Sequence, residues 1–580
     1  SAQDMLQGKV AGVNINSSTG EPGDGAQIRI RGGASLNASN DPLIVIDGMQ
    51  MSGGKKGVSN PLALVNPNDI ESFTVLKDAS ATAIYGSRGS NGVIIITTKR
   101  GRRNQAPKIS YNGNLSVSTV AKKLDVMNAS EYVSFIKDYY GEGSSAWNGL
   151  GWKEFNEDGT PNVAAGTYDT DWQDEIFRGG ISHDHNVSVA GGLGNTSWSM
   201  PYRLSVGYTS QQGILKGSDY NRLTAGFTVN PSLFKDHLTM NINGKYSYSK
   251  TVPGGQEAIS MATRMDPTRP ITSNDEMYKN WGGYWQWTKP VSEYDPTFPY
   301  GRNDDSPKNP VELVEHYGFD RSAHILLGNF EADYKIHGFE DLHLHLNLAG
   351  DYSFGGEYNT NNPQSEYGFY YGGESENTEK RYNVQATAYA QYIKDFNKDN
   401  HFDIMAGYEY SRMRYWGDSW SKTLYPSTYE GKDDAGNPLA GTMKSHDTDF
   451  WKGQTILVSW LGRANYTLLN RYLLTVTARY DGSSRFADGH RWGFFPSAAL
   501  AWKINEEAFL KNVKAISDFK LRLGWGQTGQ QDTGREYYTP TYVYSTNTHF
   551  TYPVGPNNDG TLWRPLVYNE DLTWETTTTY

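Results

Sequence analysis

The sequence predicts a mostly β protein, a transmembrane antiparallel β-barrel whose lumen holds a small N-terminal α/β domain, called the plug below. Residues 43–101 form a compact, glycine-punctuated α/β segment, and from Lys108 onward apolar and polar residues alternate with a period of two. Long irregular segments separate many of the alternating runs. We therefore expect a plug over residues 1–107 and barrel strands over residues 108–580.

The composition is compatible with such a barrel. The chain has 580 residues, including 40 Tyr and 16 Trp, and a mean hydropathy of -0.65. Membrane helices are not expected, because no run in the sequence approaches the roughly 18 apolar residues that each of them needs. A polar average does not exclude membrane strands, because only every second residue of such a strand is apolar. The abundant aromatic residues suit the girdles at the two edges of a membrane barrel, although a carbohydrate-binding β protein would also be rich in them.

The first half of the plug contains two predicted strands. Residues 28–33 (IRIRGG) form a short alternating strand that ends in two glycines. Leu43–Ile46 is wholly apolar and stops at Asp47–Gly48, a dipeptide typical of tight turns.

The second half of the plug contains two more strands and a helix. Asp69–Leu76 predicts a strand, and Ala79–Tyr85 is rich enough in alanine for a short helix that Gly86 would end. Val93–Thr97 predicts a buried strand, because the run is β-branched and too short for a helix.

The strands after the plug carry one apolar and one polar face. In residues 342–348, four leucines alternate with His343, His345 and Asn347. A soluble β-sandwich would show the same alternation, so the connections decide between the two. Short turns at 191–195, 230–236, 337–341, 395–400 and 468–471 alternate with long segments near 120–180, 251–320, 355–380, 417–451 and 529–571. Short turns at one end and long loops at the other are typical of membrane barrels, with the long loops outside the cell.

The number of predicted strands is too small for a closed transporter barrel. Residues from Lys108 onward contain about thirteen strands, and one more begins at Trp574, whereas plugged barrels of this kind have about 22. An open sheet edge is not tolerated in hydrocarbon. We therefore expect an incomplete barrel, a fragment that lacks C-terminal strands.

The plug carries several sequence motifs in a fixed order. IRIRGG is followed by LIVIDG and then by LKDASATAIYGSRGSNGVIIITTK. Later segments, 170–178 (TDWQDEIFR), 519–531 (FKLRLGWGQTGQQ) and 571–580 (DLTWETTTTY), add to the pattern. Together they resemble TonB-dependent outer-membrane transporters of the SusC/RagA family over nearly the whole chain. The resemblance implies that the fragment also lacks, before Ser1, a signal, a TonB-contacting segment and part of the plug. The plug residues that carry the resemblance are Arg29, Arg31, Gly32, Asp47, Gly48, Lys77, Asp78, Tyr85, Gly86, Arg88, Asn91 and Gly92.

The resemblance implies import of a large nutrient across the outer membrane of a bacterium. The expected cargo is an oligosaccharide or, less often, an oligopeptide, captured together with a SusD-like surface lipoprotein. The TonB–ExbB–ExbD complex would supply energy by pulling on the plug, and the barrel would contact outer-membrane lipid. A siderophore or cobalamin receptor would share the plug and the barrel. A soluble or surface glycan-binding β protein is an alternative of a different class, and it would bury the apolar strand faces inside the chain.

Several classes of function are disfavoured. The net charge of -11 provides no basic surface for nucleic acid. The chain has no cysteine, which excludes disulfides and thiol chemistry. None of the HExxH, GxxxxGK[ST], CxxC and GxSxG motifs occurs, so we expect neither an enzyme nor a cofactor. Ser1 is not preceded by a visible secretory signal.

Three polar clusters are candidate ligand sites. Gly53–Gly57 (GGKKG) is rich in glycine and lysine but lacks the spacing of a phosphate loop. The carboxylates of Asp169, Asp171, Asp174 and Glu175 lack the glycine that a calcium loop needs at its sixth position. His343 and His345 share a strand face but have no evident third ligand. We expect a mobile plug loop, a solvated acidic loop and polar lumen residues, and no metal site.

One aromatic cluster is a candidate for contact with cargo or with a partner protein. Trp281, Tyr284, Trp285 and Trp287 lie within seven residues of the predicted loop near 251–320. Flat aromatic faces can stack on sugar rings or on another protein. The alternative is that these rings pack the loop against itself or anchor it at the membrane interface.

Overall fold

The computed structural model describes most of the chain. The described residues are 8–10, 12–16, 20–30, 40–51, 61–77, 82–151, 168–289, 301–368, 370–427, 429–510, 516–531, 538–544, 552–553 and 562–580. Gly53–Gly57 therefore lies outside the described residues, as do Arg31, Gly32 and Asp78.

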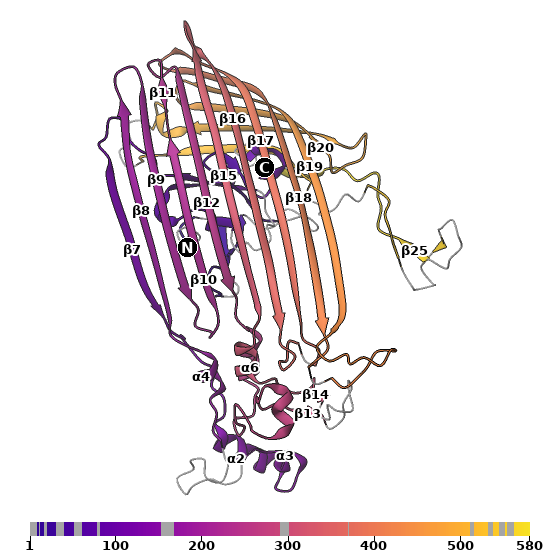
Figure 1. Cartoon of the computed structure of the whole chain (residues 1–580). Helices are drawn as coiled ribbons and strands as arrows, with labels where there is room; N and C mark the ends of the chain where they lie inside the picture. The colour runs from indigo at the N-terminus through magenta and orange to yellow at the C-terminus, as the bar shows by residue number, and fades with distance from the viewer. Residues whose placement is uncertain are drawn as a thin grey trace.

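A curved wall of antiparallel strands forms most of the molecule (Figure 1). Its strands follow one another in chain order: β7 (Lys108–Ser118), β8 (Gly180–Gly194), β9 (Ser199–Gln212), β10 (Asp219–Val229), β12 (Leu238–Val252), β15 (Phe319–Ile336), β16 (Phe339–Asn361), β17 (Gly373–Asn397), β18 (Asn400–Leu424), β19 (Met443–Leu468), β20 (Tyr472–Ser483), β21 (Trp492–Lys503), β22 (Lys520–Gln530) and β26 (Glu575–Thr579). The two-residue β11 (Ser232–Leu233) pairs beside this path. The prediction of about thirteen strands and one more near Trp574 is confirmed. Within the described residues, the sheet runs from β7 to β26 without pairing the two.

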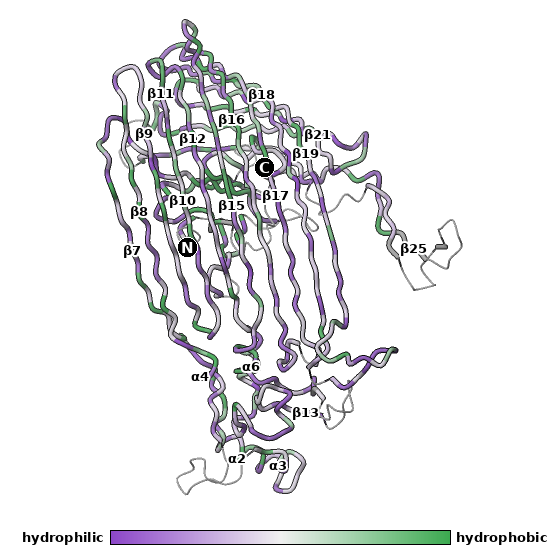
Figure 2. The backbone as a smooth tube through the Cα atoms, viewed as in Figure 1, coloured by the Kyte–Doolittle hydropathy of each residue, from purple (hydrophilic) through white to green (hydrophobic). Residues whose placement is uncertain are grey.

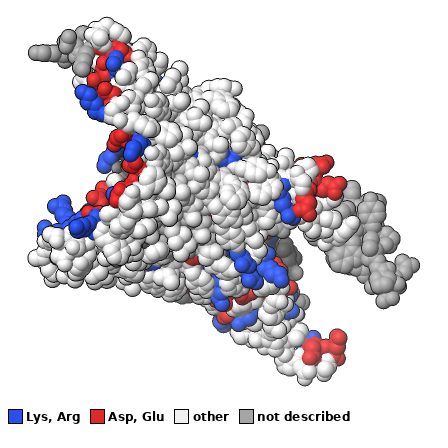
Figure 3. All heavy atoms as spheres, turned by 90° about the horizontal axis from the view of Figure 1, so that it is seen from above, with Lys and Arg blue, Asp and Glu red and all other residues white. Residues whose placement is uncertain are grey.

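The wall is apolar on its outer face and polar on its inner face. On β16, Leu344 and Leu348 are 47% and 45% exposed, whereas Asp351 on the opposite face is 3% exposed. A soluble protein buries its apolar side chains, so this pattern matches a wall whose outer face meets lipid. Figure 2 shows the corresponding alternation of hydropathy along the strands. In Figure 3, charged residues gather on a hollowed side and on projecting segments, and the broad surface between them carries few. The soluble glycan-binding alternative predicted covered apolar faces, which are not seen here.

The plug lies midway along the strands of the wall (Figure 1). Its sheet has the order β4–β3–β6–β5, with β3 (Leu43–Ile46) parallel to β6 (Val93–Thr98). The other two strands, β4 (Met49–Gln50) and β5 (Ile70–Leu76), are antiparallel to their neighbours. A separate hairpin pairs β1 (Val13–Asn16) with β2 (Gln27–Ile30). The strands expected from the plug sequence are therefore present.

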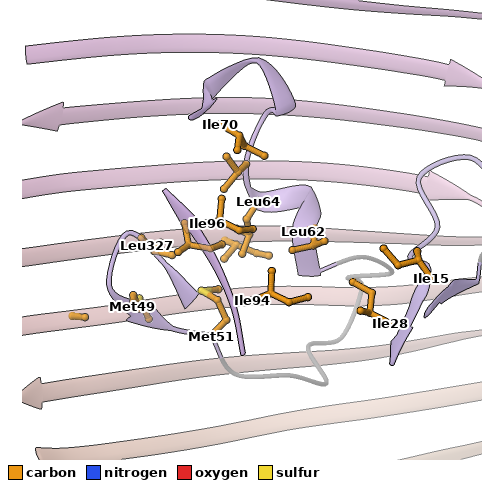
Figure 4. Close-up of a cluster of buried hydrophobic side chains, with 14 of the residues drawn as sticks. Ile15, Ile28, Met49, Met51, Leu62, Leu64, Ile70, Ile94, Ile96 and Leu327 are labelled. Atoms are coloured by element: carbon orange, nitrogen blue, oxygen red, sulfur yellow. The ribbon is translucent and has the colours of Figure 1, made fainter. Parts of the chain in front are cut away.

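The plug has its own apolar core, and the wall contributes to it. Ile94 and Ile96 are fully buried between residues of the hairpin and of the short 3₁₀ helix η1 (Pro61–Leu64). Leu327, from the inner face of β15, is 1% exposed and belongs to the same cluster (Figure 4). Burial of such side chains stabilises by about 1.5–3 kcal/mol each, so this cluster fixes the plug against the wall.

The expected plug helix differs from the structure. Residues 79–81 lie outside the described residues, and a 3₁₀ helix, η3 (Ala83–Gly89), follows them. Gly86 lies inside this element, at φ 60° and ψ −145°, and kinks it rather than ending it. The reason is spatial: the side chain of Arg479 on β20 comes so close to Gly86 that a Cβ atom would lie 2.3 Å from its Nε.

The segments that connect the strands at one end of the wall contain most of the helices (Figure 1). These elements are α2 (Ala129–Tyr140), α3 (Ser145–Asn148), α4 (Trp172–Ile176), α5 (Glu257–Ala262), η5 (Glu276–Trp281) and α6 (Pro310–Glu315). None of the helices among the described residues is both long enough and apolar enough to cross a membrane.

The remaining elements are short. They are η2 (Pro67–Asp69), β13 (Thr288–Lys289), β14 (Gly301–Arg302), η6 (Ile504–Glu506), β23 (Tyr542–Tyr544), β24 (Tyr552–Pro553) and β25 (Leu562–Pro565). Two loops are shorter than expected, because β16 and β17 extend into the 355–380 segment and β18 and β19 extend into the 417–451 segment.

Candidate functional site

The plug turn at Asp47–Gly48 connects β3 to β4 and is tied to the end of β6. Asp47 has φ 46° and Gly48 has φ 91°, as a tight turn of this kind requires. The two carboxylate oxygens of Asp47 accept hydrogen bonds from the backbone N–H and the hydroxyl of Thr98, each 2.8 Å long. The carboxylate is therefore held in one orientation, with its charge directed at the wall.

A lysine of the wall pairs with this carboxylate. Lys245 of β12 lies 2.8 Å from Oδ2 of Asp47 and donates a 3.1 Å hydrogen bond to Thr98. The side chains of Lys245 and Asp47 are 9% and 4% exposed. Asn329 of β15 also donates to the Asp47 carbonyl oxygen, over 2.7 Å. A buried ion pair thus crosses the plug–wall interface, and removing one partner of such a pair costs about 3–5 kcal/mol.

A second ion pair crosses the same side of the interface. Arg203 of β9 lies 2.7 Å from Asp69 at the start of β5, with both side chains about six-sevenths buried. Asn186 of β8 donates to the other oxygen of Asp69 over 3.5 Å. Next to it, Asn68 donates to Asp184 of β8 over 3.1 Å. The first strands of the wall and the plug are therefore joined by complementary charges.

The 3₁₀ helix η3 of the plug meets a different arrangement, on β18 and β20 of the wall. Arg479 of β20 is 1% exposed and binds two carboxylates of the wall, Glu409 at 2.9 Å and Asp481 at 2.7 Å. Its Nη1 donates to the carbonyl oxygen of Ile84 in η3 over 2.6 Å. Close by, Arg88 of the plug donates to the hydroxyl of Ser411 on β18 over 2.7 Å. At this contact the hydrogen bonds that cross the interface end on neutral oxygens.

The remaining motif residues lie mostly inside the plug. Arg29 pairs with the exposed Asp41 at 3.0 Å, and Asn91 donates to the Asp41 carbonyl over 3.5 Å. Gly92 has φ 90° and lies against Ile30, so a side chain there would collide with β2. Tyr85 is half-buried and packs against Leu43 and Val45 of β3 and Val93 of β6. Lys77 is also half-buried, at the end of β5.

The wall residues of these contacts were not identified from the sequence. Lys245, Arg203 and Arg479 each lie on the polar face of a predicted strand, where a lumen residue of any kind is expected. In the sequence, the only signal for such a contact residue is a charged residue flanked by apolar neighbours, as in YRLSV and TARYD. Their partners in the plug are more than one hundred residues away in sequence, so pairing requires the fold.

The aromatic residues near position 285 are largely buried. Trp281, Trp285 and Tyr284 are 1%, 6% and 9% exposed, in a cluster with α4, α5 and α6. The hydroxyl of Tyr284 donates a hydrogen bond to the carboxylate of Glu315. Burial and this carboxylate raise the pKa of Tyr284. Trp287 is half-buried, and the Arg269 guanidinium lies 4.9 Å from the centre of its ring. This burial favours packing of the loop against itself, and contact with cargo or a partner stays a prediction.

The other polar clusters have structural partners. Asp171 caps α4 and, with Asp174, binds Lys123. His343 and His345 face Asp333 and Glu331 of β15, at 3.0 Å and 3.3 Å. In the part of the chain that the structure describes, no group of three or more potential ligand side chains is arranged to hold a metal ion.

Comparison with known proteins adds three findings. Residues 1–93 match the family model of the TonB-dependent receptor plug domain. The whole chain is 46% identical to the TonB-dependent receptor SusC of Bacteroides thetaiotaomicron, covering 55% of that protein. Over 99% of its length it is 30% identical to the TonB-dependent receptor P3 of Formosa agariphila, covering 52%. The chain therefore spans about half the length of the curated relatives it matches.

A solved structure shares the fold. The RagAB peptide importer in its closed-closed state superposes with a TM-score of 0.75 at 21% identity, over 99% of this chain and 62% of that one. At this level of identity the likeness concerns the arrangement of wall and plug.

Proposed function

Because this chain belongs to the SusC/RagA family of TonB-dependent receptors, we propose that the protein imports a large nutrient, an oligosaccharide, across the outer membrane of a bacterium. The plug closes the lumen, and cargo passes when the plug is displaced. A SusD-like surface lipoprotein captures the cargo with it, and the TonB–ExbB–ExbD complex supplies the work.

The observation that carries this proposal is the pair Asp47–Lys245 at the buried interface of plug and wall. Displacing the plug breaks this pair together with the Arg203–Asp69 pair and the hydrogen bond from Asn329 to Asp47. Thermal motion therefore rarely opens the passage. A gate of this kind needs an external source of work, which suits a transporter coupled to an energised partner.

The outer face of the wall supports the location in a membrane. Large apolar side chains are exposed on strand after strand, from Leu204 on β9 to Leu523 on β22. In water such a surface would aggregate, because contiguous apolar patches of this extent mark an interaction site. Lipid of the outer membrane is the partner that fits this face.

The proposal is tested by uptake. A strain that produces the full-length protein as its sole transporter of this family should take up a labelled oligosaccharide. Uptake should stop when TonB is deleted, when the SusD-like lipoprotein is deleted, or when the proton gradient is collapsed. Uptake that continues without TonB would contradict the proposal.

Oligopeptide import by the same mechanism is the alternative with a specific observation behind it, the fold shared with the RagAB peptide importer. The same strain, given a labelled peptide mixture of matched size, separates the two cargo classes. Uptake of a ferric siderophore or of cobalamin in place of both would assign the protein to those receptors.

A further inference from the structure

A tryptophan lies flat on the inner face of the wall, beside the plug. Trp451 of β19 pairs directly with Gly417 of β18, and Gly417 pairs with Glu379 of β17, so all three share one face of the sheet. A Cβ atom on Gly417 would lie 2.4 Å from the indole ring, which shows how closely the ring covers this glycine. The indole N–H donates to Glu379 over 3.3 Å. The ring therefore crosses β18 and is fixed at its far edge.

Polar and aromatic groups surround this ring. Arg381 donates to Glu379 over 2.9 Å and lies 5.3 Å from the centre of the Tyr415 ring. Tyr415 in turn covers Gly453, where a Cβ atom would lie 2.3 Å from it. The side chains of Glu379 and Arg381 are 7% and 11% exposed, and Trp451 is half-buried. Two rings are thus held against glycines on neighbouring strands, with a neutralised carboxylate–guanidinium pair at their edge.

The position of this cluster relative to the plug follows from the neighbouring residues on the same face of β17 and β18. Two residues beyond Arg381 on β17, Asn383 donates to the plug at the carbonyl oxygen of Gln50 over 3.3 Å. On β18, Ser411 receives the hydrogen bond of Arg88. The cluster lies on the side of these contacts nearer to the long connecting segments, because β17 begins there at Gly373. It therefore lines the lumen directly outside the plug.

We propose that Trp451, Glu379 and Arg381 form a binding site for an uncharged sugar ring of the cargo, an inference that rests on the proposed import function. The apolar C–H face of a pyranose packs on an indole, and its hydroxyls bond to paired carboxylate and guanidinium groups at the ring edge. The glycine beneath the ring lets the indole lie flat against the sheet. Because Glu379 and Arg381 neutralise each other, the site carries no net charge to attract a charged cargo.

The test measures binding in the absence of TonB. The full-length protein is purified in detergent and titrated by calorimetry with two probes, maltoheptaose and cellohexaose. At least one probe should bind the wild type. Replacing Trp451 with alanine (Trp451→Ala) should raise the dissociation constant of that probe by about tenfold or more, since the stacked ring is a large part of the contact. Trp451→Phe keeps an aromatic face but loses the indole N–H, and its affinity for the probe should lie between that of the wild type and that of Trp451→Ala. Trp416→Ala is the matched control, because Trp416 is the neighbouring β18 position on the outer face of the wall.

Each outcome decides the proposal. Unchanged affinity in Trp451→Ala would overturn it, as would equal losses in Trp451→Ala and Trp416→Ala. Failure of both probes to bind, with a peptide mixture bound instead, would overturn the sugar assignment. Uptake in cells is a separate readout: if it proves independent of TonB while Trp451 still controls sugar binding, the proposed function fails and the binding site stands.

Discussion

The two contacts between plug and wall place their charges differently. At the Asp47–Lys245 contact, the anion belongs to the plug and the cation to the wall. At the Arg479 contact, the cation and both carboxylates that neutralise it belong to the wall, and the bond to the plug ends on the Ile84 carbonyl. Moving the plug away breaks an ion pair at the first contact but leaves the ion pairs of Arg479 intact at the second.

This difference separates two tasks. The Arg479 cluster stabilises β18, β19 and β20 as parts of the wall, whether or not the plug is in place. The Asp47–Lys245 pair stabilises the closed state alone. Substitutions at the two contacts should therefore affect different properties of the protein. Three substitutions at these contacts test this, and a fourth, at Arg103 outside both, shows the size of the effect at an exposed pair.

The largest effect is expected for Arg479→Met. It leaves Glu409 and Asp481 buried without their cation. Breaking one buried pair typically lowers the free energy of unfolding by about 3–5 kcal/mol, and the loss here should be larger because two pairs are broken. The wall should lose stability, measured as the urea concentration at which the purified protein unfolds. A variant as stable as the wild type would show that the cluster does not support the wall.

A smaller and more local effect is expected for Lys245→Met. Asp47 would lose its partner, and the plug should loosen by about 3–5 kcal/mol while the wall keeps its stability. Hydrogen exchange should rise at the amides of β3 and β6 and stay unchanged in β17 to β19. The double variant Asp47→Asn with Lys245→Met removes both charges and should recover most of the loss. Faster exchange throughout the wall would contradict the assignment of this pair to the plug.

Gly86→Ala should have an intermediate effect at the second contact. Gly86 has φ 60°, and a Cβ atom there would lie 2.3 Å from Arg479 Nε and 2.8 Å from Asp481 Oδ2. The strain should cost about 1–3 kcal/mol and shift η3 without breaking the ion pairs of the wall. Exchange should rise in residues 83–89 only. Gly328→Ala on β15 serves as a comparison, because Gly328 has no positive φ and a Cβ atom there would meet nothing within 4 Å.

The smallest effect is expected for Arg103→Ala, in the segment that joins plug and wall. Arg103 lies 2.6 Å from Asp236, and both side chains are about half exposed, so the pair contributes less than about 1 kcal/mol. Hydrogen bonds from Arg103 and Ser232 lower the pKa of Asp236 to about 2. The pair therefore stabilises above the usual carboxyl pKa of about 3.9, and its contribution disappears as the pH falls toward 2. Wild-type and variant unfolding curves should differ slightly at pH 7 and coincide near pH 2.

Much of the fold follows from local sequence. The period-two alternation of residues 342–348 and the apolar run at Val93–Thr97 are each sufficient to place a strand, because the pattern repeats with the geometry of the strand itself. The kink at Gly86 does not follow from local sequence, because it depends on Arg479, almost four hundred residues later. The extension of β18 to Leu424 was also missed, since polar strands beyond a membrane resemble loops.

The candidate site was only half predictable. Asp47 was identified, because the Asp–Gly turn is a local signal, but Lys245 was not. Lumen positions accept many polar residues, so neither the charge nor the partner of a given one can be inferred from alternation. The aromatic cluster around Trp285 shows the same limit, since its composition predicts contact with flat ligands but says nothing about burial.

The central claim is that the plug must leave the wall for cargo to pass. Gly48→Cys with Asn347→Cys introduces a reducible link between plug and wall, and these 580 residues contain no other cysteine. A Cβ atom on Gly48 would lie 3.5 Å from the side-chain nitrogen of Asn347, so the two substituted side chains would face each other across the interface. Uptake of labelled oligosaccharide by cells should stop when the link is oxidised and return when it is reduced, while each single variant transports throughout. Undiminished uptake with the plug fully cross-linked, as verified by mass spectrometry, would contradict the account.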